Sequence, residues 1–216
     1  MYTKGKYEIK EGKGEVIEFD YNGSFIFKGK YLNGKRSGYG SENNFGIFFE
    51  GNYLNGMKHG SGKEKNIYGD YIFEGEYLFG QKNGKGKEYY RGNLKYDCEF
   101  LNGIKISGEE YYDDGKLLFK GEFKNNERWK GNLFEYPSLF GNSRIELELL
   151  EGKRNNYGRE YNEDGELIFE GEYLEFKKNR KGKEYYKNNE IIFEGEYYKG
   201  FRWNGKGKEY NDNGKL

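Results

Sequence analysis

Phe73-Glu74-Gly75-Glu76-Tyr77, followed by Lys85-Gly86-Lys87-Glu88-Tyr89, is a pattern that recurs twice more in this chain with few changes. The copies are Phe169-Glu170-Gly171-Glu172-Tyr173 with Lys181-Gly182-Lys183-Glu184-Tyr185, and Phe193-Glu194-Gly195-Glu196-Tyr197 with Lys206-Gly207-Lys208-Glu209-Tyr210. A unit repeated at a nearly fixed period indicates a solenoid, in which each copy packs only on its neighbours. The repeat therefore predicts the architecture before any single residue does.

Weaker copies extend this pattern over most of the 216 residues. The first apolar residue of each unit is Phe27, Phe49, Phe73, Tyr96, Phe119, Ile145, Phe169 or Phe193. We therefore expect a repeat array over residues 27–216, with units starting near these positions, and a degenerate N-terminal capping hairpin over residues 1–26, because terminal repeats are usually atypical. The one proline, Pro137, predicts an insertion near residues 133–143, with an enlarged loop near 137–143.

Each unit is predicted to be one β-hairpin. In its first half, apolar residues and Gly alternate with Glu, which is the period of a strand with one wet face. The second half follows a loop of about four to six residues that carries Asn and Gly. Pairs such as Asn22-Gly23 and Asp114-Gly115 between units are typical of turns. The expected fold is all-β: a single-layer antiparallel β-meander of about eight repeated hairpins.

The glycines inside these strands need a reason, because Gly weakens a strand. Gly75 lies two residues after Phe73 and two before Tyr77, so all three positions face the same side. We expect an aromatic ring from the adjacent strand to lie flat on the bare backbone there. Aromatic residues make up 19% of a chain that is only 34% hydrophobic, which favours an aromatic ribbon over a globular interior. Cys98 stands at a glycine position and is expected to be a small buried residue.

The opposite face is predicted to carry charges in pairs. Glu74 and Glu76 lie in one strand, and Lys85 and Lys87 lie in its hairpin partner. Lys and Arg together number 37, and so do Asp and Glu. This balance favours neutralisation within the sheet. It argues against a nucleic-acid surface, and it does not favour an anionic membrane surface.

No motif for catalysis emerges. The single His59 cannot form a metal cluster or a Ser-His-Asp triad, and it is expected to have a structural role in a loop. The spacing from Gly200 to Lys206 resembles a phosphate-binding loop, but Gly207 replaces the Ser or Thr that such a loop requires. We therefore expect no enzyme, no catalytic residue, no cofactor and no metal. A single Cys and the lack of an apolar N-terminal segment favour a cytoplasmic location.

The pattern Tyr/Phe-x-Gly-x-Tyr-x-x-Gly-x-x-x-Gly-x-Gly, at about 23 residues per unit, resembles the MORN repeat (membrane occupation and recognition nexus). Its clearest copy runs from Phe49 through Gly51, Tyr53 and Gly56 to Gly62. The resemblance covers essentially the whole chain. It implies an elongated, curved MORN-like solenoid that serves protein–protein contact, scaffolding and in some members phospholipid contact.

The leading hypothesis is a non-enzymatic scaffold that binds another protein through an aromatic groove or through the insertion between Trp129 and Phe140. The expected contact residues are Tyr31, Tyr53, Tyr77, Trp129, Phe134, Phe140, Tyr173, Tyr197 and Trp203. Two alternatives stay open: peripheral binding of anionic phospholipid membranes, and a bacterial antitoxin-like or immunity partner. End-to-end self-association through the last predicted strand, residues 206–210, is a further expectation.

Overall fold

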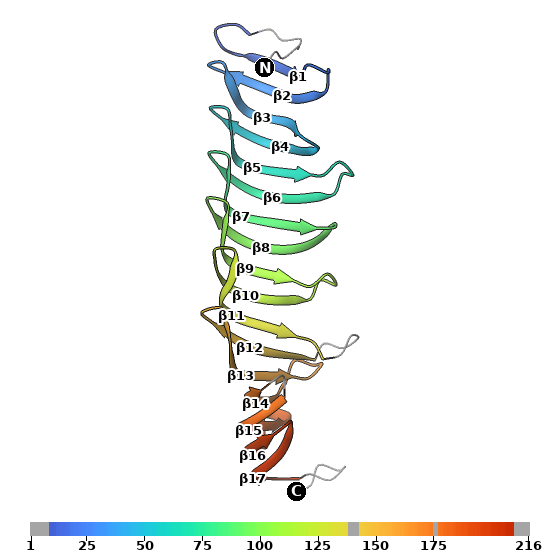
Figure 1. Ribbon diagram of the computed structural model, residues 1–216, viewed down its shortest axis with the longest axis vertical. Coiled ribbons are helices and arrows are strands. Elements are labelled where there is room, and N and C mark those ends of the chain that lie inside the picture. Colours follow the sequence, from blue (N-terminus) through green and yellow to red (C-terminus); the bar gives the residue numbers. More distant parts are fainter. Residues whose placement is uncertain (1–8, 138–142, 175–176, 210–216) are drawn as a thin grey trace. The chain divides into compact units, whose positions relative to one another are not determined.

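The computed structural model describes residues 9–137, 143–174 and 177–209. These residues form 17 antiparallel strands, which Figure 1 labels in order, and one short 3-10 helix at Lys187–Asn189. They divide into two compact units, and the boundary falls within β10 (Leu117–Lys124). No helix in the described ranges is long and apolar enough to cross a membrane.

Within each unit, strands that follow one another in the sequence are hydrogen-bonded neighbours, which confirms the antiparallel meander of hairpins. The first unit holds β1 (Gly14–Phe19), β2 (Phe25–Leu32), β3 (Lys35–Asn44), β4 (Ile47–Leu54), β5 (Met57–Lys65), β6 (Tyr71–Leu78), β7 (Gln81–Tyr90), β8 (Asn93–Leu101) and β9 (Ile104–Tyr111). The second unit holds β11 (Glu127–Glu135), β12 (Arg144–Leu150), β13 (Lys153–Tyr161), β14 (Leu167–Leu174), β15 (Lys177–Tyr186), β16 (Glu190–Tyr198) and β17 (Phe201–Gly207).

The turns inside the hairpins are shorter than expected wherever the structure describes them. Between β6 and β7 the turn consists of Phe79 and Gly80 alone, both at positive φ, as a tight two-residue hairpin turn requires. The prediction of a loop of four to six residues is therefore wrong. The residues assigned to that loop belong to β7, where Gly84, at φ 86°, lies in a bulge that takes up the extra length. His59 likewise lies in strand β5 and not in a loop.

A column of glycines crosses the sheet at right angles to the strands. In the first unit, each member is the cross-strand partner of the next. The members are Gly29, Gly40, Gly51, Gly62, Gly75 and Gly86, followed by Cys98 and Gly108. In the second unit the column starts at Leu147 and continues through Gly158, Gly171, Gly182, Gly195 and Gly205. The positions of Cys98 and Leu147 in this column agree with the sequence pattern.

The glycine column makes room for aromatic rings, but the ring over Gly75 comes from its own strand and not from the adjacent strand, as was expected. Phe73 is fully buried, and its ring folds over Gly75 of its own strand and over Gly86 of the partner strand. A Cβ atom at Gly75 would lie 2.7 Å from the tip of that ring. The next hairpin contributes Phe100, which meets Phe73 edge to face at 5.6 Å between ring centroids. Ring-on-backbone packing is thus confirmed, with the covering ring supplied by its own strand for Gly75 and by the adjacent strand for Gly86.

Cys98 replaces one glycine of the column and is 3% exposed. Burial raises the pKa of its thiol to about 12. A thiol that stays protonated and buried is inert, as the interpretation of Cys98 as a small packing residue requires.

The predicted insertion begins later than residue 133. Leu133 and Phe134 lie in β11, at 4% and 8% exposure, opposite Leu147 and Glu146 of β12. Only residues 136–143 connect β11 to β12, and the structure describes just part of that connection. The last strand also differs from the prediction, since β17 covers Phe201–Gly207.

Candidate functional site

The tyrosines expected to line an aromatic groove are already packed within the sheet. Tyr53, Tyr77, Tyr173 and Tyr197 are only 3–5% exposed, and Tyr31 is half-buried. Each of the four buried rings meets the Phe of its own hairpin edge to face. These side chains therefore leave no open ring face for a partner.

The other expected contact residues are scattered. Trp129 is half-buried in β11, where its backbone carbonyl accepts a hydrogen bond from the amide of Gly152. Phe134 is buried. Trp203 is 73% exposed in β17 and lies beside Tyr198. Phe140 lies outside the described residues.

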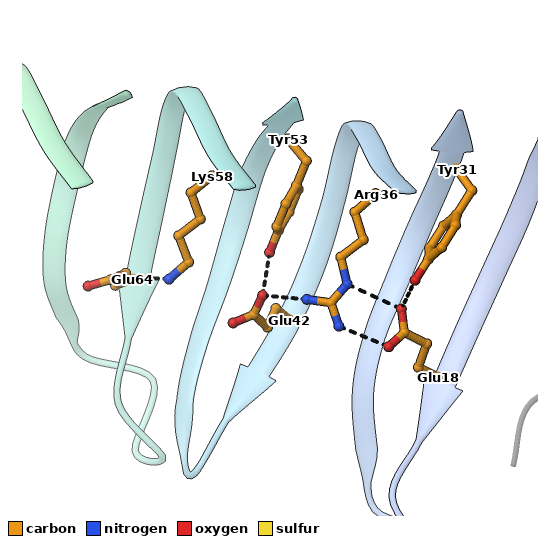
Figure 2. A network of polar contacts seen from close by, with 7 residues as sticks. All are labelled: Glu18, Tyr31, Arg36, Glu42, Tyr53, Lys58 and Glu64. Carbon is orange, nitrogen blue, oxygen red and sulfur yellow. Dashed lines mark hydrogen bonds and ion pairs between the residues drawn. The ribbon is translucent and has the colours of Figure 1, made fainter. Parts of the chain in front are cut away.

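On the aromatic face, hydroxyl and charged groups bond to one another beside the rings. Figure 2 shows Arg36 between two carboxylates: its guanidinium donates to Glu18 at 2.9 Å and to Glu42 at 2.8 Å. The hydroxyls of Tyr31 and Tyr53 donate to the same two carboxylates. Burial by itself would raise the pKa of Glu18, but the hydrogen bonds from Arg36 and Tyr31 outweigh it and lower that pKa.

This arrangement recurs along the array, and it was not recognised in the sequence. A Lys or Arg nine residues after the register Phe lies over that ring, at 4.2–4.7 Å from its centroid. The pairs are Arg36 with Phe27, Lys58 with Phe49, Lys82 with Phe73, Lys178 with Phe169 and Arg202 with Phe193. In four of these units, a Glu fifteen residues after the Phe pairs with a cation in the described structure: Glu42, Glu64, Glu88 and Glu184. These two fixed spacings were the signal that could have revealed the network.

The aromatic face therefore satisfies its own charges. The cations stabilise the Phe rings and bond the glutamates, and Glu42 and Glu184 also accept hydrogen bonds from Tyr hydroxyls. Its residues are accounted for by stability, so a binding surface is better sought on the opposite face.

On the opposite face, the residues next to the glycine column form a charge ladder. In the first unit the ladder runs across five strands, with alternating sign and one member per strand: Glu50, Lys63, Glu74, Lys87 and Asp97. Lys63 bonds Glu74 at 3.1 Å, and Lys87 bonds Asp97 at 3.4 Å. The predicted pairing of Glu74 with Lys87 across the hairpin is confirmed by the register, although each of the two forms its ion pair with the neighbouring hairpin.

A tyrosine fixes the central carboxylate of the ladder. The Tyr89 hydroxyl donates to Glu74 at 2.9 Å. Hydrogen bonds from Lys63 and Tyr89 lower the pKa of Glu74. Burial and the bond to Glu74 raise the pKa of Tyr89 to about 12. Glu74 therefore stays a carboxylate at neutral pH.

The second unit has the same ladder at equivalent positions. Its members are Glu146, Arg159, Glu170, Lys183, Glu194 and Lys206. Arg159 lies 3.7 Å from Glu170, and Lys183 lies 3.3 Å from Glu194. Tyr185 donates to Glu170 at 2.6 Å, as Tyr89 does to Glu74.

Each unit has a groove on this face, with the glycine column as its floor. In the first unit the groove measures about 540 Å³, with Gly51, Gly62, Gly75 and Gly86 along the floor. In the second unit it measures about 390 Å³, and its floor consists of Gly171, Gly182 and Gly195. The charge ladder forms one wall. The facing wall includes Tyr39, Ser61, Glu76 and Lys85 in the first unit, and Lys181 and Glu196 in the second.

Some charged groups of the grooves are open to a ligand. In the part of the chain that the structure describes, Glu50, Glu76 and Lys85 form no ion pair and are exposed, so they are open to a ligand. Both grooves carry one more carboxylate than ammonium group among their lining residues. Within the described ranges, no three His, Cys, Asp or Glu side chains gather to hold a metal ion.

Comparison with known proteins does not assign the chain to a family. No protein-family model matches the chain, and no curated protein matches it.

Proposed function

We propose that this protein is a non-enzymatic, MORN-like repeat scaffold that binds another protein through the two charged grooves. One observation carries the proposal: both units have a groove with a glycine floor and the same charge ladder at equivalent repeat positions. Cavities of this size fall in the range of ligand sites. The aromatic face, in contrast, is filled by its own rings.

Charge reversal tests this proposal. The partner is captured on immobilised protein and quantified for the wild type, for the double variant Glu74→Lys/Glu170→Lys, and for Glu163→Lys, which changes an exposed turn residue. We expect the double variant to lose the partner and Glu163→Lys to retain it. Circular dichroism confirms that each variant is folded. Equal recovery on all three proteins would exclude the grooves as the binding surface.

The same experiment examines the contact residues predicted near the insertion. Trp129→Ala is captured alongside the groove variants. Loss of the partner with Trp129→Ala, but not with the groove variants, would move the proposed surface to β11.

A second candidate function is contact with a membrane surface through turn tips. Phe45, Ile67 and Tyr68, in the turns after β3 and β5, are 103%, 64% and 83% exposed. Apolar side chains at such tips can enter the interfacial region of a bilayer. Flotation with acidic and with neutral liposomes, at two salt concentrations, tests this function. If the wild type floats with the liposomes and the double variant Phe45→Ser/Tyr68→Ser does not, the result supports membrane contact through the turn tips. If the wild type does not float, membrane contact is excluded.

A further inference from the structure

The shape of the grooves limits what they can hold. The two walls of each groove stand on residues two apart in the same strand, which places them about 7 Å from each other. An α-helix with its side chains is about 10–12 Å wide and does not fit between them. The floor has no side chains over four strands of the first unit, from Gly51 to Gly86. The opening therefore admits one extended polypeptide lying across the strands.

The spacing of the charges selects the conformation of that polypeptide. The carboxylates of the ladder recur on every second strand, at Glu50, Glu74 and Asp97 in the first unit. Strands lie about 4.8 Å apart, so these carboxylates recur about every 9.6 Å. A polyproline II helix repeats its side-chain direction every three residues, or about 9.3 Å. A β-strand repeats its direction about every 6.7 Å and does not match.

The sign of the charges selects the ligand's side chains. Each groove has an excess of carboxylates, and Glu50 and Glu76 have no cation bonded to them among the described residues. The second unit repeats the carboxylate spacing with Glu146, Glu170 and Glu194. Arginine is the best match, because its guanidinium binds a carboxylate through two hydrogen bonds.

We infer that each groove binds a proline-rich segment in the polyproline II conformation, with an Arg at every third position directed at the carboxylates of the ladder. This inference rests on the proposed function and names its ligand class. Because both units carry the ladder, one chain binds two such segments. The glycine floor leaves room for the polyproline II backbone, and the carboxylates of the ladder bind arginines that are spaced three residues apart.

Synthetic peptides test the inference. The probes are four repeats of Arg-Pro-Pro, a peptide of the same composition with its four arginines in one block, and four repeats of Glu-Pro-Pro. Isothermal titration at low salt measures affinity and stoichiometry with the full chain. We expect two Arg-Pro-Pro peptides per chain, binding about tenfold weaker for the block peptide, and no binding for Glu-Pro-Pro.

Single-site variants place the peptide in the grooves. Glu74→Gln and Glu170→Gln are each expected to lower the stoichiometry from two to one, whereas Glu163→Gln keeps it at two. Equal affinity for the ordered and the block peptide would overturn the inference, because attraction would then depend on charge alone. If no peptide binds while Glu74→Lys/Glu170→Lys still loses its partner, the ligand class is wrong and the proposed function stands.

Discussion

At the scale of single residues, this fold depends on glycines, which have no side chain, at fixed positions in the strands. A Cβ atom at Gly75 would lie 2.6 Å from the Cα of Gly86 and 2.7 Å from the ring of Phe73. Neither the backbone of the partner strand nor a fully buried ring can give way without repacking. The strand glycines thus allow a thin sheet to bury aromatic rings in place of a conventional core.

Gly75→Ala is expected to destabilise the protein by about 1–3 kcal/mol, because the added methyl group overpacks the column. Unfolding in urea, followed by circular dichroism, measures the change. The control is Gly92→Asn, at a turn position with open space around it and φ at 80°, a conformation that Asn tolerates. If the two variants unfolded at the same urea concentration, packing on the glycine column would not stabilise the fold.

Phe45 lies at φ 49° with its ring fully exposed. A bulky residue pays for this left-handed backbone conformation, and Asn adopts it more readily. Phe45→Asn is therefore expected to raise stability by about 0.5–1 kcal/mol, seen as a higher melting temperature. A lower melting temperature would mean that the ring of Phe45 stabilises the fold through contacts with its neighbours.

At the scale of the hairpin, cations connect one repeat to the next. Arg36 bonds Glu18 of β1 and Glu42 of β3, and all three side chains are 15–20% exposed. Removing the guanidinium leaves two half-buried carboxylates without their cation.

Arg36→Met is expected to cost about 1–3 kcal/mol, since the two carboxylates keep only their Tyr hydroxyls. Lys35→Met, at the exposed neighbouring position, serves as the control and is expected to change stability by less than about 0.5 kcal/mol. The urea midpoints of the two variants provide the comparison. The network would have no stabilising role if Arg36→Met behaved like Lys35→Met.

The titrating groups of the hairpins predict how stability depends on pH. The pKa values of Glu18 and Glu74 are lowered in the folded state. Their contribution to the free energy of unfolding is therefore complete above the pKa of the unfolded chain and is lost as the pH falls through the pKa of the folded protein. The pKa of Tyr89 is raised to about 12, so its contribution is complete below pH 10 and is lost as the pH rises to about 12. The melting temperature should therefore fall at acidic pH and again at alkaline pH. Tyr89→Phe should reduce the fall at alkaline pH. An unchanged alkaline limb in that variant would contradict this assignment.

At the scale of the whole molecule, backbone pairing within each unit joins strands that are consecutive in the sequence, and side chains such as Arg36 and Phe100 reach one strand further. Stability should then be a sum over repeats and the interfaces between them, as in other solenoids. A complete repeat can therefore be removed without separating any other pair of repeats.

Deleting residues 49–72 removes one 24-residue repeat and places Phe73 directly after Phe48, in the register position of Phe49. We expect a folded protein whose unfolding enthalpy, measured by calorimetry, falls by about one ninth, in proportion to length. Deleting residues 49–60 instead removes about half a repeat, which disrupts the strand alternation and should prevent cooperative unfolding. A complete-repeat deletion that failed to fold would show that distant parts of the chain depend on one another.

Much of the fold could be predicted from the sequence, because repetition multiplies a weak local signal. The hairpins, the strand glycines, and the positions of Cys98 and Leu147 in the glycine column all follow from one aligned pattern. The two-residue turns were missed because residues such as Gly84 look like loop residues while lying in a bulge. The cation network was missed because nine- and fifteen-residue spacings connect strands, not neighbours in one strand.

The sequence by itself determined the repeat, the all-β class and the alternation of an aromatic with a charged face, because each is a property of local periodicity. Only the tertiary structure decided which face is open. It buries Tyr53, Tyr77, Tyr173 and Tyr197 on the aromatic face at 3–5% exposure and leaves a glycine-floored groove between charged walls on the other face. The physical reason is the strand register, which places each Phe ring over its own and its partner's glycine and so fills one side of the column while the other stays empty.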